Sequence, residues 1–198
     1  MLPGVTLLYE DSAGERAEFG LHDLVVCCVA DRLGCEPWAL KDRLRGYPKN
    51  GNSKVWTACR QELPRLTRTG HVVVAVFDND RVRSMAKLAL DACKVRVTEA
   101  IKRGCDPASL LRVVLIEQNT ESVLVGLRSL GAVQGREEAF ALAIERKDVA
   151  SRDILFKLAA RRLTAEQRAS LLAAVPSLGY LVGKVVAMLR EPPAPDPG

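Results

Sequence analysis

The sequence predicts an α/β protein: a parallel sheet flanked by helices, with a C-terminal helical extension. Nearly continuous apolar runs at 5–9, 71–77 and 111–116 have the composition of strands that are buried on both faces. Segments with apolar residues at three- and four-residue spacing separate these runs, which is the alternation of strand and helix typical of a parallel sheet. Beyond residue 136 only helical patterns remain.

The first half of the chain is read from local signals. A helix is expected over 18–33, because apolar residues recur there at helical spacing and a glycine follows. The run 38–40 is a candidate short strand, and 46–52 is a loop by its turn residues. A helix is expected from Ser53, as its N-cap, to residue 66.

The second half continues the alternation and then becomes helical. A long helix over 82–103 is expected to end at a glycine, and the strand 111–116 is followed by a helix that contains 123–130. The later helices are expected at 136–147, 151–162 and 164–189, the last broken at Pro176.

These elements divide the chain into three parts. Residues 1–132 are expected to form the α/β domain, 133–190 a helical extension packed on it, and 191–198 a flexible Pro-rich tail. Neither a secretory signal nor a membrane-spanning run is apparent, so we expect a cytoplasmic protein with no membrane partner.

Composition narrows the chemistry. The chain has 198 residues, a net charge of +5 and a pI of about 9.0, which permits an anionic partner such as nucleic acid. It has only two histidines, and its six cysteines form no C-x-x-C pair. A zinc site and a histidine-based nucleophile set are therefore disfavoured, and reduced, buried cysteines are expected.

Acidic residues follow each of the three apolar runs: Glu10, the pair Asp78 and Asp80, and Glu117. Because the carboxyl ends of parallel strands meet at one edge of a sheet, these side chains are expected to lie close together. Clustered carboxylates repel one another unless a cation neutralises them, and oxygen ligands select Mg²⁺ or Mn²⁺. The alternative is that each acid is a helix N-cap.

The order of these motifs resembles the Toprim domain of topoisomerases, bacterial primases and OLD-type nucleases. The resemblance covers about residues 5–130, through Leu7-Leu8-Tyr9-Glu10 and Val74-Ala75-Val76-Phe77-Asp78-Asn79-Asp80. It implies that Glu10 acts near the scissile phosphate as a general base or metal ligand, and that Asp78 and Asp80 hold Mg²⁺. Catalytic roles thus fall to Glu10, Asp78 and Asp80.

The chain is also similar to small stand-alone Toprim-like proteins associated with ATPase partners in bacterial defence systems. These have a further acidic motif after the next strand, where this chain has Ile116-Glu117-Gln118-Asn119-Thr120-Glu121. The resemblance implies Glu117 and Glu121 as additional metal ligands and an ATPase as a possible partner. In place of the usual glycines, Asp11 follows the first motif and Arg81 the second, and Arg81 is then a candidate phosphate contact.

Basic residues supply candidate contacts to nucleic acid: Arg45, Lys49, Lys54 and Arg81. The alternative for the first three is an ordinary solvated surface. The cations from Arg152 to Arg168 are interpreted as a solvated helix face.

Together these observations predict a Mg²⁺- or Mn²⁺-dependent nuclease that hydrolyses phosphodiester bonds of DNA or RNA, as a defence or toxin effector. The alternative is a non-catalytic Toprim-like interaction module that partners an ATPase. A primase-like nucleotidyl transferase is a distant third, because no nucleotide- or zinc-binding annex is present.

Overall fold

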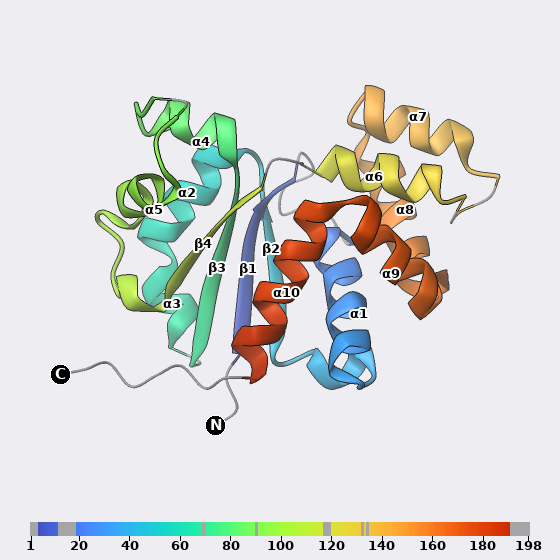
Figure 1. The fold of residues 1–198 in the computed structure, drawn as a ribbon, viewed down its shortest axis with the longest axis horizontal. Helices are drawn as coiled ribbons and strands as arrows, with labels where there is room; N and C mark the ends of the chain where they lie inside the picture. Colours follow the sequence, from blue (N-terminus) through green and yellow to red (C-terminus); the bar gives the residue numbers. More distant parts are fainter. Residues whose placement is uncertain are drawn as a thin grey trace.

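The computed structural model of the chain describes residues 4–11, 19–68, 70–89, 91–116, 120–131, 133 and 135–190, except the side chains of Asp80 and Thr120. The predicted C-terminal tail therefore lies outside the described residues. Within these ranges the protein is a parallel sheet flanked by helices and followed by a helical stretch, as the sequence predicts (Figure 1).

Four parallel strands form the sheet in the order β2-β1-β3-β4. Their bounds are β1 Gly4–Glu10, β2 Leu44–Lys49, β3 His71–Asp78 and β4 Leu111–Ile116. From the central pair β1 and β3, the chain passes outward to β2 on one side and to β4 on the other. The carboxyl ends of β1 and β3 therefore flank the point where the strand order reverses, the usual place for a ligand in such a sheet.

Helices cover both faces of the sheet (Figure 1). On one face lie α1 and α10, with α6 to α9 beyond them, and on the other lie α2 to α5. The bounds are α1 Leu21–Leu33, α2 Asn52–Gln61, α3 Leu63–Thr67, α4 Asn79–Met85, α5 Lys94–Lys102, α6 Thr120–Ser129, α7 Glu137–Glu145, α8 Val149–Arg162, α9 Ala165–Ala174 and α10 Pro176–Arg190, with short 3₁₀ helices η2 Pro37–Leu40 and η3 Ala108–Leu110.

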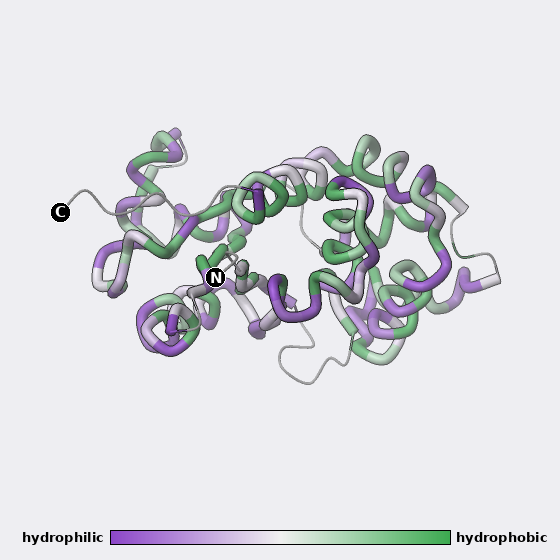
Figure 2. Tube along the Cα trace, turned by 90° about the horizontal axis from the view of Figure 1, so that it is seen from below, coloured by the Kyte–Doolittle hydropathy of each residue, from purple (hydrophilic) through white to green (hydrophobic). Residues whose placement is uncertain are grey.

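The strands separate two apolar cores, because successive side chains of a strand point to opposite faces. In β1, Leu7 packs in the core under α1 and α10, whereas Leu8 packs in the core under α2 and α5. In β3, Val74 packs in the core under α1 and α10, and Phe77 packs in the core under α2 and α5. Figure 2 shows these apolar strand segments between the helical layers. Because both faces of these strands are buried, their sequences are apolar at nearly every position.

The C-terminal helices share the first of these cores with the sheet. Val182 of α10, Leu155 of α8 and Leu24 of α1 belong to the same buried cluster as Leu7. All six cysteines are free; four are buried, whereas Cys35 and Cys93 are exposed, contrary to the prediction that all are buried.

The segment predicted as a loop at 46–52 is instead largely strand β2. It contains Gly46 and Pro48, which argue against a central strand, but β2 is at the edge and, among the described residues, pairs only with β1. An edge strand tolerates proline, because one side of its backbone needs no partner strand. The candidate strand at 38–40 is wrong as well, since these residues form η2.

Two predicted helices begin or end differently. The helix after the loop begins at Asn52 with Gly51 as its N-cap, in place of Ser53, and α3 follows it as a separate helix from Leu63. The long helix predicted over 82–103 is two helices, α4 and α5. Lys87, just after α4, has a left-handed backbone with φ of 54°, which ends the first of them.

Among the residues that the structure describes, no single helix has the length and apolar character needed to cross a membrane. The helices α9 and α10 meet that criterion only as a pair, and the pair is bent by 116°.

Candidate functional site

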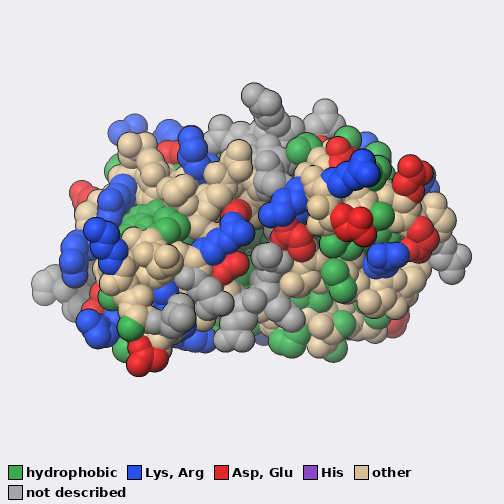
Figure 3. All heavy atoms as spheres, turned by 90° about the horizontal axis from the view of Figure 1, so that it is seen from above, with side chains coloured by type: hydrophobic (Ala, Val, Ile, Leu, Met, Phe, Trp, Pro, Cys, Tyr) green, Lys and Arg blue, Asp and Glu red, His purple; other side chains and the backbone are tan. Residues whose placement is uncertain are grey.

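A small pocket of about 50 Å³ lies at the carboxyl ends of β1 and β3, at the reversal of strand order. Charged side chains of both signs form its wall, and Figure 3, which looks onto this end of the molecule, shows Lys and Arg beside Asp and Glu. The charged residues that line the pocket are Glu10, Asp11, Asp78, Arg81, Glu121, Lys147 and Arg152.

Asn52 joins the ends of the two central strands. Its side-chain Nδ2 donates to Glu10 Oε2, and its Oδ1 accepts from the backbone N–H of Asp78 at 3.2 Å. Asn52 is buried at the start of α2, where the helix begins immediately after Gly51. Because one amide satisfies a group from each strand, it sets the position of Glu10 relative to Asp78.

The carboxylate of Glu10 faces this pocket and is partly buried. Burial raises its pKa, and the nearby charges of Asp78 and Glu121 raise it further, against the opposing charges of Arg81 and Lys147. Arg81 Nη1 lies 3.2 Å from Glu10 Oε1. The negative charge of Glu10 is therefore only partly compensated, which suits a group that accepts a proton or binds a cation.

Asp78 has a structural role beside any chemical one. Its Oδ1 accepts a hydrogen bond, at 3.3 Å, from the backbone N–H of Arg81, which is the third residue of α4. This is the geometry of a helix N-cap, the alternative that the sequence left open for each acid. The cap turns α4 so that the side chain of Arg81 reaches back to Glu10.

A buried ion cluster supports the other wall of the pocket. Arg152 of α8 is only 2% exposed, and its Nη2 lies 2.7 Å from Glu121 Oε1 while its Nη1 lies 3.7 Å from Asp11 Oδ1. Its Nε also donates to the carbonyl of Ala143 at 3.1 Å. Despite burial, the hydrogen bond and charge of Arg152 lower the pKa of Glu121, and the charge of Lys147 adds to this effect. Glu121 is therefore held ionised.

A hydrogen bond leads away from the pocket through Tyr9. The Tyr9 hydroxyl lies 2.7 Å from Nδ1 of His22, and the opposite ring nitrogen lies 3.4 Å from Asp23 Oδ2. Burial raises the pKa of Tyr9 well above its ordinary value and lowers the pKa of His22. Both groups are therefore neutral near pH 7, with the phenol as donor, and His22 lies behind the pocket wall.

The structure brings together several of the residues that the sequence nominated. Glu10, Asp78, Arg81 and Glu121 line one pocket. The side chain of Asp80 and all of Glu117 lie outside the described residues.

The predicted basic contacts are dispersed. Lys49 is buried, 7% exposed, with its amine 2.9 Å from Glu62 Oε1, so its prediction as a nucleic-acid contact is wrong. Its side chain is directed into the protein because β2 presents that face to α2 and α3. Arg45 is exposed but lies toward the start of β2, away from the pocket, whereas Lys54 is exposed in the first turn of α2.

Sequence reasoning missed Arg152, Asn52 and Asp11. The interpretation of Arg152 as part of a solvated helix face is wrong, because it is buried between two carboxylates. One signal could have found it: Arg152 precedes Leu155 and Phe156 by three and four positions, which places it on the apolar face of α8.

The donor chemistry of the pocket fits a hard divalent cation in part. Glu10 and Asp78 offer carboxylate oxygens, the ligands that Mg²⁺ and Mn²⁺ prefer, and the raised pKa of Glu10 reflects a charge that a cation would compensate. Among the described side chains, no three of His, Cys, Asp or Glu form a group able to hold a metal ion. A complete ligand set would therefore need Asp80 or bound water.

No family model, curated protein or solved structure matches the chain, so the geometry of this pocket carries the argument for function.

Proposed function

We propose that the chain is a metal-dependent phosphodiesterase of the Toprim type that cleaves nucleic acid. The observation that carries this proposal is the placement of Glu10 and Asp78 on neighbouring parallel strands, in one pocket, with both strand ends joined by Asn52. Glu10 and Asp78, together with Asp80, would hold Mg²⁺ or Mn²⁺. Such an ion polarises a phosphate oxygen and lowers the pKa of a bound water.

The protein's own cations have a distinct role in this proposal. Arg81 is 59% exposed, so its guanidinium is free to turn from Glu10 toward an incoming phosphate without breaking buried contacts. Lys147 is also half-exposed on the other side of the pocket, 3.8 Å from Glu121. A phosphodiester that draws Arg81 away would leave Glu10 able to bind the metal or accept a proton from water.

The net charge and the free cysteines of the chain support the same class of function. The net charge of +5 favours an anionic polymer as substrate, and six free cysteines suit the reducing cytoplasm. A role as effector in a defence or toxin module, with an ATPase as partner, follows from the family resemblance described above.

A second function is favoured by a specific observation. Both carboxylate oxygens of Glu10 accept hydrogen bonds from the protein itself, one from Asn52 and one from Arg81. Acids that are satisfied in this way stabilise a sheet edge without a metal. The chain would then be a non-catalytic interaction module that binds an ATPase partner.

A cleavage assay separates the two. Plasmid DNA, single-stranded DNA and tRNA are incubated with Mg²⁺ or Mn²⁺ and the wild type, Glu10→Gln, or Asp78→Ala with Asp80→Ala. The control is Glu99→Gln, an exposed acid of α5. The nuclease predicts cleavage by the wild type and control only, with thermal melting showing that all variants fold. No metal-dependent cleavage and no heat of metal binding would favour the interaction module.

A further inference from the structure

A second, much larger groove runs along the outer edge of β2, between that strand, α1, η2 and α8. Its volume is about 580 Å³ and its floor is apolar, with Val26 of α1 and Leu44 of β2. Trp38 of η2 stands at its rim and is 77% exposed. The indole of Trp38 is therefore available to stack against a flat group that enters the groove.

The groove combines aromatic rings with cations. Phe19 lies in its wall with Lys157 Nζ at 5.0 Å and the Arg161 guanidinium at 5.5 Å from its ring. Tyr47 of β2 also lines the groove, while its ring packs against the core under α2 and α5. The ring of Phe19 is therefore presented beside positive charge and not among apolar neighbours alone.

The charge of the groove is positive. Lys41, Arg45 and Arg161 are exposed cations that line it. Among the described residues that line it, Asp23 is the one acid, and its carboxylate already accepts a hydrogen bond from the backbone N–H of Gly20 at 2.9 Å. An occupant of this groove must therefore offer negative charge as well as flat apolar groups.

We propose that this groove binds a single strand of nucleic acid, with a base stacked on Trp38 and phosphates held by Lys41, Arg45 and Arg161. Exposed rings interleaved with cations are the surface that single strands recognise, because unpaired bases stack and the backbone needs counter-charge. A duplex keeps its bases stacked on one another, so it has no unpaired base that could stack on Trp38. Arg45 has an exposed ion pair with Asp42, at 3.8 Å, but an apolar peptide would cover the ring and offer no further counter-charge to the cations.

The groove lies directly behind the candidate pocket. His22 lines the groove, and its Nδ1 lies 2.7 Å from the hydroxyl of Tyr9, which lines the pocket. This pair of side chains therefore links the wall of the groove to the wall of the pocket. As a statement about substrate, the inference rests on the proposed nuclease function; as a statement about binding, it is measured without cleavage.

The fluorescence of Trp38 provides the test. In Trp56→Phe, Trp38 is the one remaining tryptophan, since the chain has two. This variant is titrated with a thymidine oligonucleotide of about ten nucleotides, in EDTA so that no metal-dependent cleavage occurs. We expect saturable quenching by the single strand and little by a duplex of the same length. Equal quenching by both, or none by the single strand, would overturn the proposal.

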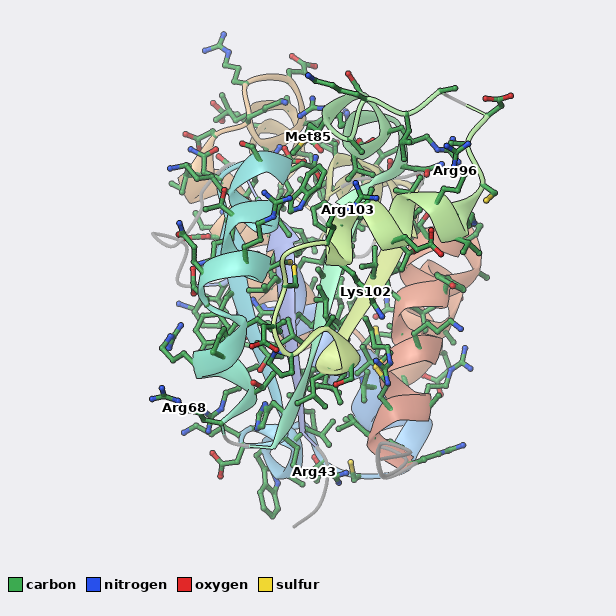
Figure 4. The ribbon with its side chains drawn as sticks, turned by 90° about the vertical axis from the view of Figure 1, so that its left-hand side faces the viewer. Arg43, Arg68, Met85, Arg96, Lys102 and Arg103 are labelled. Atoms are coloured by element: carbon green, nitrogen blue, oxygen red, sulfur yellow. The ribbon has the colours of Figure 1, made fainter. Side chains whose placement is uncertain are left out.

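Binding to a labelled oligonucleotide, followed by anisotropy, measures affinity without tryptophan as reporter. Trp38→Ala is expected to weaken binding about tenfold or more, the usual loss when a base loses its aromatic partner, and Trp38→Phe to restore most of it. Arg45→Gln with Arg161→Gln should reduce the salt dependence of binding. The charge-matched control is Arg96→Gln in α5 with Arg103→Gln at the C-cap of that helix, on the opposite side of the sheet (Figure 4).

The two proposals fail in different ways. If the wild type binds tightly through Trp38 but never cleaves, the proposed binding groove stands and the proposed nuclease function is wrong. If the wild type cleaves in the presence of metal, and Trp38→Ala melts like the wild type and binds with the same affinity, the nuclease function stands and the proposed groove is wrong.

Discussion

Arg81 Nη1 lies 3.2 Å from Glu10 Oε1, so a cation of the protein occupies one side of the carboxylate that is the first candidate metal ligand. The two residues are 71 positions apart and meet because α4 begins directly at the end of β3. Under the proposed function, the pair explains why position 81 holds an arginine: its cation compensates Glu10 until a metal or a phosphate displaces it.

Removal of Arg81 should therefore strengthen metal binding. In Arg81→Ala, Glu10 loses its competing cation, so we expect tighter binding of Mn²⁺ by calorimetry. The cost in stability should stay below about 1 kcal/mol, because the arginine is largely exposed and such pairs contribute little. Arg96→Ala, an exposed arginine of α5, is the control. Weaker Mn²⁺ binding in Arg81→Ala would contradict the competition between the two cations.

The stability of the protein should depend on both the size and the charge of the side chain at position 52. Asn52→Ala removes a buried amide that serves Glu10 and Asp78, and we expect a loss of about 1–3 kcal/mol of unfolding free energy in urea. Asn52→Asp keeps the shape but places a carboxylate against Glu10. Its deficit relative to wild type should be larger at pH 7 than near pH 4, where protonation removes the repulsion; a deficit independent of pH would contradict this.

Glu10 and Glu121 should affect the pH dependence of stability with opposite signs. The raised pKa of Glu10 means that the folded state binds its proton more tightly than the unfolded state, so stability falls as pH rises above the ordinary carboxyl value of about 4.3. The lowered pKa of Glu121 gives stability that is present above that value and lost as pH falls through the folded pKa.

Denaturation curves from about pH 3 to pH 7 check these signs. As pH rises over this range, the stability of Glu10→Gln relative to the wild type should increase. The stability of Glu121→Gln relative to the wild type should decrease. The same slope change in both variants would show that the two carboxylates are not held differently.

Arg152 should be among the most sensitive positions in the C-terminal helices. Arg152→Met leaves Asp11 and Glu121 without their buried partner, and we expect a loss of about 3–5 kcal/mol. Adding Asp11→Asn and Glu121→Gln to Arg152→Met should recover much of that loss, because the uncompensated charges are gone. A single-variant loss under about 1 kcal/mol would mean that the cluster is not buried as described.

Two glycines of α10 should respond oppositely to alanine. A Cβ at Gly183 meets nothing within 4 Å, so Gly183→Ala should stabilise the protein by up to about 1 kcal/mol through helix propensity. A Cβ at Gly179 would lie 2.9 Å from the carbonyl oxygen of Leu172 in α9, so Gly179→Ala should destabilise by about 1–3 kcal/mol. Melting temperatures of the two variants test the packing of α9 on α10; a rise in both would contradict it.

The central strands were predictable because their signal is local. Residues 71–77 are apolar at every position after His71, and a strand with this pattern fits only the interior of a sheet. The edge strand β2 was missed, because Gly46 and Pro48 give the signal of a turn. What makes them acceptable is the absence of a second partner strand for β2, which a local window does not contain.

For the candidate site, the alternation of strand and helix was enough to predict that Glu10 and Asp78 lie close together, since it brings the ends of parallel strands to one edge. The groups that surround these two carboxylates were not predictable in this way. Asn52, Arg81 and Arg152 come from the starts of α2, α4 and α8, and their contacts depend on how those helices pack. Backbone propensity is set by neighbours in the chain, whereas the partners of a buried charge are set by packing between distant segments.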